Sequence, residues 1–165
     1  MGLRKGGNET IWNIIVPIKV RIHFWRTRLD RLATLVNLSD KGVVTGSMLC
    51  PLCRQQPENG DHLFARRDKM LEVRKAVNCW WDVIPESCAG IQGLCGDHRH
   101  SKKMNTFELI KDAVMQAYCW AVWKCRNEVV FNCKSFNPLV VANDIQSVVY
   151  SWFCYRIFKG KNYSW

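Results

Sequence analysis

The chain has 165 residues, a hydrophobic content of 48% and a formal net charge of +10 at pH 7. This length suits one domain, or one small domain with a helical extension, and the apolar content excludes wholesale disorder. The positive charge favours contact with polyanions, nucleic acid first among them, although a merely soluble basic protein has the same composition.

The first helix is predicted at about 17–30, after a polar and Gly-rich segment at 1–10. Pro17 suits the first turn of a helix, because its missing N–H would have no partner there. Apolar residues then recur at helical spacing, and we expect this stripe to face the core. The stripe consists of Ile18, Ile22, Trp25 and Leu29.

Two more helices are predicted before residue 85. Thr34 is a good N-cap for a short second helix, and Gly42 can end it in the left-handed conformation. Asp61 is a good N-cap for a third helix at about 61–84, which Pro85 ends.

The C-terminal half is predicted to be helical as well. A Gly-rich, polar stretch at 85–103 is typical of a linker. Two long helices follow at about 106–133 and 138–157, within a helical extension at 104–158, and a basic tail occupies 159–165. The sequence leaves open whether this extension shares a core with the first half. The fold class is mainly α.

A C-x-x-C pair followed by a histidine is the cluster with metal chemistry. Cys50 and Cys53 flank a Pro-Leu turn, a spacing that lets two thiolates face one metal ion. His62 follows after eight turn-rich residues and would direct its imidazole at the pair. A closed zinc site needs a fourth ligand, and no cysteine follows within the next helical turn. The alternative is two buried small hydrophobes and a surface histidine.

Several further motifs surround this cluster. They are Ile11-Trp12-Asn13, Val16-Pro17-Ile18-Lys19-Val20, Phe24-Trp25-Arg26, Arg31-Leu32, Asn37-Leu38, Gly42, Leu49-Cys50-Pro51-Leu52-Cys53, Glu58 and Asp61-His62-Leu63-Phe64. Together they resemble the zinc-binding domain of reverse transcriptases, which in plants lies at the C-terminal end of the polyproteins of non-LTR (LINE-type) retrotransposons. The resemblance is close over about 11–84 and loose over 104–157.

The resemblance implies zinc as the cofactor, held by Cys50, Cys53 and His62, and a reverse transcriptase or another protein as a partner. The family has a cysteine where this chain has Arg67, and usually a tryptophan where it has Arg74. Each change needs a single base transition, which suggests a short and partly degraded copy. We therefore predict that zinc binding is weakened or lost. A non-functional transposon remnant is the alternative.

Basic residues provide the candidates for nucleic-acid contact, by phosphate attraction without base readout. They are Lys19, Arg21, Arg26 and Arg28 on the first helix, with Arg66 and Arg67 beside the cysteine cluster. A solvated helix face is the alternative for each. A helical protein-interaction module is a second functional class, because Trp120, Trp123 and Trp152 could dock a partner.

An enzyme is the third class, and the sequence argues against it. A polymerase needs paired carboxylates that hold two metal ions, and this chain has no Asp-Asp pair after an aromatic residue. A three-ligand zinc hydrolase using the nearby Glu58 lacks an oriented general base. We therefore expect no catalysis and no small-molecule substrate, and any polymerase activity would belong to the parent polyprotein.

The N-terminus and the cysteine content indicate the compartment. Nine cysteines are an odd number, and the first seven residues lack the apolar segment of a signal peptide. We expect reduced thiols and an intracellular, soluble protein, in the nucleus or the cytoplasm. No apolar run has the length of a membrane span, so no membrane partner is expected.

Overall fold

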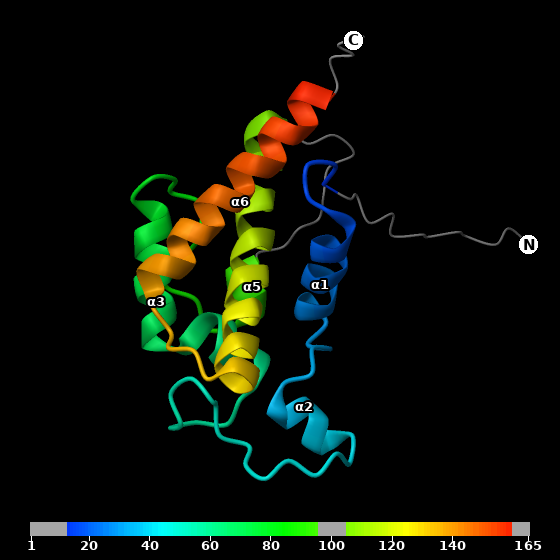
Figure 1. The fold of residues 1–165 in the computed structure, drawn as a ribbon, viewed down its shortest axis with the longest axis vertical. Helices are drawn as coiled ribbons and strands as arrows, with labels where there is room; N and C mark the ends of the chain where they lie inside the picture. The colour runs from blue at the N-terminus through cyan, green and yellow to red at the C-terminus, as the bar shows by residue number, and fades with distance from the viewer. Residues whose placement is uncertain (1–12, 96–104, 160–165) are drawn as a thin grey trace, which may run out of the picture.

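The fold consists of helices joined by turns and by one folded-back loop (Figure 1). The computed structural model describes residues 13–95 and 105–159. In chain order the elements are α1 (Ile18–Arg28), α2 (Leu35–Asp40), the π-helical turn η1 (His62–Arg66), α3 (Asp68–Asn78), α4 (Ile91–Cys95), α5 (Thr106–Asn132) and α6 (Pro138–Lys159). The mainly α prediction is confirmed. The predicted segment 1–10 and nearly all of the basic tail 159–165 lie outside the described residues.

Helix α1 turns a different face to the core from the one that its sequence predicts. Its buried residues are Val20, His23, Phe24 and Thr27. The predicted inward stripe, Ile18, Ile22, Trp25 and Leu29, is instead between 43% and 65% exposed. That stripe has basic side chains on both sides, and its burial would also desolvate those charges. The polar Thr27 can be buried because its hydroxyl donates to the His23 carbonyl at 3.0 Å.

Helix α2 has the ends that its sequence predicts. The Thr34 hydroxyl accepts from Asn37 N at 3.3 Å, which makes Thr34 the N-cap. Gly42 follows the helix with a φ of +78°, a conformation that favours glycine. Both predictions rest on chemistry within a few residues, and both are confirmed.

The single helix predicted at 61–84 is wrong in its middle and at its end. Arg67 separates η1 from α3 with an extended backbone, at ψ 134°. Helix α3 then ends at Asn78, whose side-chain amide donates to the Ile84 carbonyl at 2.8 Å. This bond turns the chain back, so the helix stops well before Pro85.

A short helix lies within the stretch that was predicted as a linker. Helix α4 buries Ile91 and Leu94, which are 4% and 1% exposed, so this part of 85–103 is structural. Gly90 precedes it because the backbone approaches Asp61 closely: an added Cβ would lie 2.5 Å from Asp61 Oδ1. The same oxygen accepts from Ile91 N at 2.8 Å. The glycine therefore serves a close contact as well as a loop.

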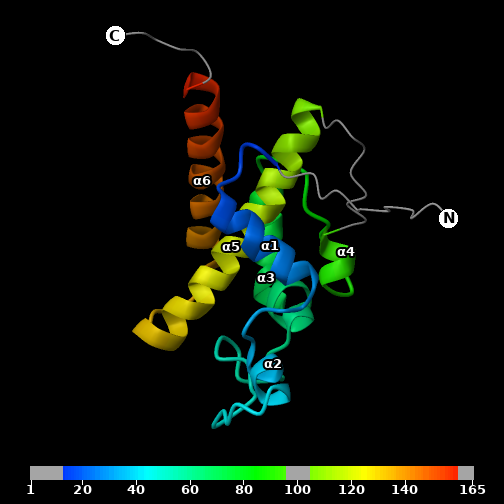
Figure 2. The ribbon, with the colours of Figure 1, turned by 90° about the vertical axis from the view of Figure 1, so that its right-hand side faces the viewer.

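One hydrophobic core joins the two halves of the chain. Helix α6 packs against both α3 and α5, and α1 packs against α5; Figure 2 shows how these helices are arranged. Phe64 and Val73 from the first half share a buried cluster with Tyr118 and Ile145 from the second. This core crosses the boundary that the sequence predicts between the first domain and the helical extension.

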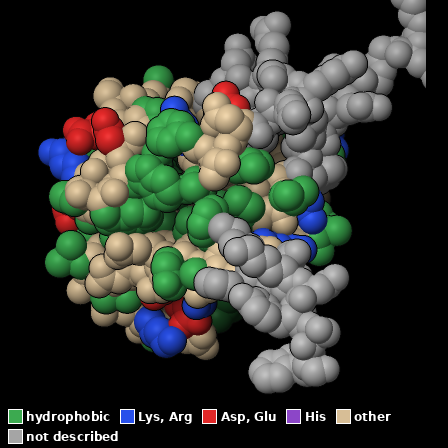
Figure 3. Space-filling view, turned by 90° about the horizontal axis from the view of Figure 1, so that it is seen from above, with side chains coloured by type: hydrophobic (Ala, Val, Ile, Leu, Met, Phe, Trp, Pro, Cys, Tyr) green, Lys and Arg blue, Asp and Glu red, His purple; other side chains and the backbone are tan. Residues whose placement is uncertain are grey.

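Apolar side chains also gather at one end of the bundle. Figure 3 views the end at which α6 terminates and α1 begins, and shows many of them on the surface. Ile15, Pro17 and Trp152 line a hollow of about 370 Å³ between these two elements. In the described part of the chain, no helix combines the length and the apolar character that crossing a bilayer requires.

Candidate metal centre

The loop at 48–58 folds back as a small hairpin that holds the two candidate thiols. Cys50 N donates to the Gln56 carbonyl at 2.8 Å, next to a single antiparallel bridge. Arg54 N donates to the Cys50 carbonyl at 2.7 Å, and Arg54 has a φ of +55° that closes the turn. Cys50 is fully buried and Cys53 is half-buried. The hairpin thus places both cysteines on one side of a tight turn.

The start of η1 delivers the imidazole of His62. Asn59 Oδ1 accepts from His62 N at 2.8 Å, so Asn59 satisfies the first exposed amide of this turn. Asp61, the N-cap that the sequence predicts, makes no such bond and accepts from Ile91 N instead. His62 is 6% exposed and faces the hairpin.

The three candidate ligands converge. The donor atoms of Cys50, Cys53 and His62 all lie within 4.8 Å of one another. Cys53 Sγ lies 3.2 Å from His62 Nε2. Donor atoms on one tetrahedral zinc ion lie about 3.5–3.8 Å apart, because zinc bonds are about 2.3 Å to sulfur and 2.0 Å to nitrogen. Small adjustments would therefore bring the three donors to zinc-binding distances.

Burial shifts the proton affinities of this site. Desolvation raises the pKa of the Cys50 thiol, against the effect of hydrogen bonds from the Leu52 and Cys53 backbone and of the Arg67 charge. Desolvation also lowers the pKa of His62, and Arg67 lowers it further. His62 is therefore neutral at pH 7, which is the form that binds a metal ion, whereas Cys50 must lose a proton on binding.

Arg67 lies close enough to Cys50 and His62 to act on both electrostatically, and it does not fit a zinc site. It is 5% exposed, and its three guanidinium nitrogens have no hydrogen-bond partner among the described residues. Its guanidinium carbon lies 4.3 Å from the centre of the Phe136 ring. A guanidinium has no lone pair for a metal ion, and its charge repels one. Three donors therefore fit zinc. Arg67, at the position where the resemblance implies a fourth ligand, opposes zinc binding.

Comparison with protein families decides what this part of the chain is. A family model described as zinc-binding in reverse transcriptase matches residues 4–80. Residues 4–80 belong to this family. Neither a curated protein nor a solved structure matches the chain. The zinc-binding domain so matched contains the three candidate ligands and Arg67, and it ends before α4.

Arg74, which occupies the position where the resemblance implies a tryptophan, is buried with hydrogen-bond partners. Arg74 is 3% exposed, and its guanidinium donates to the carbonyls of Ala65 at 3.0 Å and Glu86 at 3.1 Å. These bonds hold the end of η1 against the segment that precedes α4. Of Arg67 and Arg74, only Arg67 has all of its side-chain nitrogens unpaired among the described residues.

A buried ion pair links the zinc-binding domain to the extension. Arg126 of α5 donates to Glu58 through Nε at 2.8 Å and Nη2 at 2.7 Å. Glu58 is fully buried and also accepts from Leu35 N at 3.0 Å. Sequence reasoning missed this pair, because 68 residues separate its members and no local pattern links Glu58 to Arg126.

The basic residues predicted to contact nucleic acid have different environments. Lys19, Arg26 and Arg66 are exposed, and Arg21 and Arg28 are half-buried. At 100° per residue, Lys19 and Arg26 border the exposed apolar stripe of α1 on one side, and Arg21 and Arg28 border it on the other. Arg67 is buried, and this position argues against direct phosphate contact. For the other five, the contact stays a prediction.

Proposed function

We propose that this chain is a non-catalytic zinc-binding module derived from a reverse transcriptase. The observation that carries the proposal is the convergence of Cys50, Cys53 and His62 in a segment of the matching family. Bound zinc would cross-link the loop at 48–58 to η1. Because Arg67 occupies the fourth position, we infer a weaker zinc affinity than a four-ligand site has.

A structural role fits this site better than a catalytic one. A hydrolase needs a general base beside the metal ion. Glu58 would be the candidate, but both of its carboxylate oxygens already accept from Arg126. The carboxylate is also fully buried. Glu58 therefore supports the fold, and its geometry gives no support to metal-assisted hydrolysis.

Zinc content of the purified full chain tests the proposal. After equilibration with excess zinc and removal of the free metal, we expect bound zinc in the wild-type protein and a clear loss in Cys50→Ser. Cys79→Ser is the matched control, because Cys79 is exposed and lies outside the three-residue cluster. Equal zinc content in the wild type and Cys50→Ser would contradict the proposal.

We also propose that the module contacts nucleic acid through its exposed basic side chains. The support is the net charge of +10 and the exposure of Lys19, Arg26 and Arg66. Such contacts weaken steeply with salt, because bound counterions are released from the phosphates. A mobility-shift assay over a salt series tests this, and no shift even at low salt would remove the nucleic-acid role.

A helical protein-interaction module is the second candidate function. The observation that favours it is the exposed stripe of α1, formed by Ile18, Ile22, Trp25 and Leu29. Its basic borders fit an apolar helix with acidic flanks. A synthetic helix with a leucine stripe and glutamate flanks should bind more tightly than one with lysine flanks, by calorimetry. Failure of the glutamate peptide to bind would remove this candidate.

A further inference from the structure

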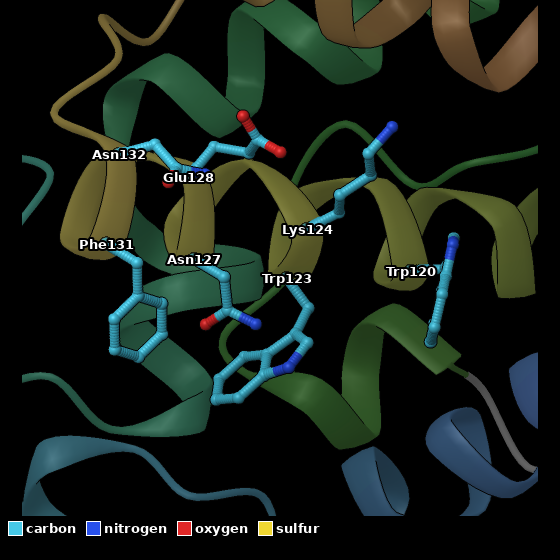
Figure 4. Close-up of a pocket in the computed structure, with 7 residues that line it drawn as sticks. All are labelled: Trp120, Trp123, Lys124, Asn127, Glu128, Phe131 and Asn132. Carbon is cyan, nitrogen blue, oxygen red and sulfur yellow. The ribbon is translucent and has the colours of Figure 1, made fainter.

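A groove on α5 lies outside both the zinc site and the matched segment (Figure 4). It has a volume of about 260 Å³, and its lining includes Trp120, Trp123, Asn127 and Phe131. These residues follow one another at spacings of three or four, which places them on one helix face. Figure 4 shows Trp123, Asn127 and Phe131 projecting from the same side of α5. We call this feature the aromatic groove.

The two tryptophans of the aromatic groove are held in place by neighbouring side chains. The His23 ring of α1 lies 5.3 Å from the Trp120 ring and 6.0 Å from the Trp123 ring, centre to centre. The Arg126 guanidinium lies 5.1 Å from the centre of the Trp123 ring. Phe131 is 73% exposed. The groove thus combines fixed rings at one end with an open ring at the other.

Positive charge borders the aromatic groove. Lys124 belongs to its lining, and Lys19 Nζ lies 5.7 Å from the centre of the Trp120 ring. Glu128 is the acidic residue in the lining, and it forms an ion pair with Lys134. Aromatic faces beside cationic side chains are the combination that grooves for single-stranded nucleic acid use. An apolar peptide would match the rings but would not match the positive charge of Lys19 and Lys124.

We propose that the aromatic groove binds single-stranded nucleic acid by stacking its bases. Phe131 and Trp123 are the stacking platforms, while Lys19 and Lys124 attract the phosphates. Double-stranded nucleic acid cannot bind the groove in this way, because its bases are already stacked on one another. The proposal rests on the proposed contact with nucleic acid and adds a contribution from the bases, which phosphate attraction does not require.

Fluorescence anisotropy with two labelled oligonucleotides tests the proposal on the full chain. One is an oligothymidylate of about twelve nucleotides, and the other is an abasic strand with the same phosphates. At one fixed low salt concentration we expect the oligothymidylate to bind at least about fivefold more tightly, because base stacking on an aromatic ring adds affinity that the abasic strand lacks. Phe131→Ala should remove about this factor for the oligothymidylate and leave the abasic strand unchanged.

Phe107→Ala is the matched control. Phe107 is also an exposed phenylalanine of α5, at 56%, and it lies outside the lining of the aromatic groove. Its replacement should leave both affinities unchanged, and circular dichroism should show the same helix content in both variants.

The possible failures are distinguishable. Binding of neither strand at low salt would overturn the proposed nucleic-acid contact. Equal binding of both strands, with no effect of Phe131→Ala, would overturn the stacking proposal but not the proposed nucleic-acid contact. A protein would then be the better candidate for the aromatic groove. Equal loss of affinity in the Phe131 and Phe107 variants would overturn it as well.

Discussion

Arg67 occupies the position where the family resemblance implies a fourth zinc ligand, and the replacement Arg67→Cys tests that assignment. A four-ligand structural site contributes about 10–16 kcal/mol of apparent binding free energy. An equal share is about 2.5–4 kcal/mol per ligand, or roughly 60- to 700-fold in the dissociation constant. The replacement also removes a cation that would repel the metal ion. The same cation lowers the pKa of Cys50 and of His62, so its removal also strengthens competition from protons and offsets part of this gain. We therefore expect zinc to bind on the order of 100-fold more tightly.

Without zinc, the Arg67→Cys variant should be less stable than the wild-type protein. Arg67→Cys removes the contact with the Phe136 ring, which contributes up to about 2 kcal/mol when desolvated, and leaves a cavity. It also removes an unpaired buried guanidinium, which offsets part of this loss. Competition with a chromogenic chelator measures the affinity, and thermal unfolding with and without zinc measures the stability. The zinc-dependent rise in melting temperature should be larger in the variant.

Arg67→Ser is the control that separates the two contributions, because serine removes the charge without supplying a thiolate. We expect it to tighten zinc binding much less than Arg67→Cys does. Equal gains in the two variants would show that the charge alone matters. A variant Arg67→Cys that binds zinc no more tightly than the wild type would refute the assignment of this position as the missing ligand.

Two further predictions concern buried groups. Glu58→Leu leaves Arg126 buried without its partner, so the free energy of unfolding, measured in urea, should fall by about 3–5 kcal/mol. Adding Arg126→Met should recover much of this loss, because no unpaired charge then remains buried. A loss under about 1 kcal/mol in Glu58→Leu would contradict the prediction. The second prediction concerns His23, whose pKa burial lowers to about 4 in the folded protein, against about 6.5 in the unfolded chain. Between pH 6.5 and pH 4 the unfolded chain therefore binds more protons than the folded protein does. Stability should therefore fall as the pH falls through this range, by about 1.4 kcal/mol per pH unit and about 3 kcal/mol in all. His23→Phe should flatten the profile, and identical profiles would refute the assignment.

The sequence predicted those features whose chemistry is local. Thr34 and Gly42 mark the ends of α2 because a cap bonds a residue three positions away and a left-handed residue needs no distant partner. Cys50, Cys53 and His62 could be grouped because their spacing permits one short hairpin and one helical turn. In each case the decisive contact lies within about a dozen residues.

The features that were missed depend on partners far along the chain. Helix α1 has apolar residues on two faces, and only the position of α5 decides which face is buried. Helix α4 has five residues and a glycine in a Gly-rich stretch, so no periodicity could reveal it before its packing was known. The extended backbone at Arg67, which divides the third helix, likewise has no local signal such as proline.

The ion pair between Glu58 and Arg126 also bears on how far the fold of this zinc-binding domain depends on zinc. Isolated zinc-finger peptides are unfolded without metal, because the ion supplies most of the free energy of folding. In this chain the hairpin at 48–58 is closed by backbone bonds, and Glu58 holds its end to both α5 and the start of α2. Arg126 comes from the extension, outside residues 4–80. The extension therefore holds the loop through contacts that do not involve zinc, so we expect the fold to persist when a zinc ligand is replaced.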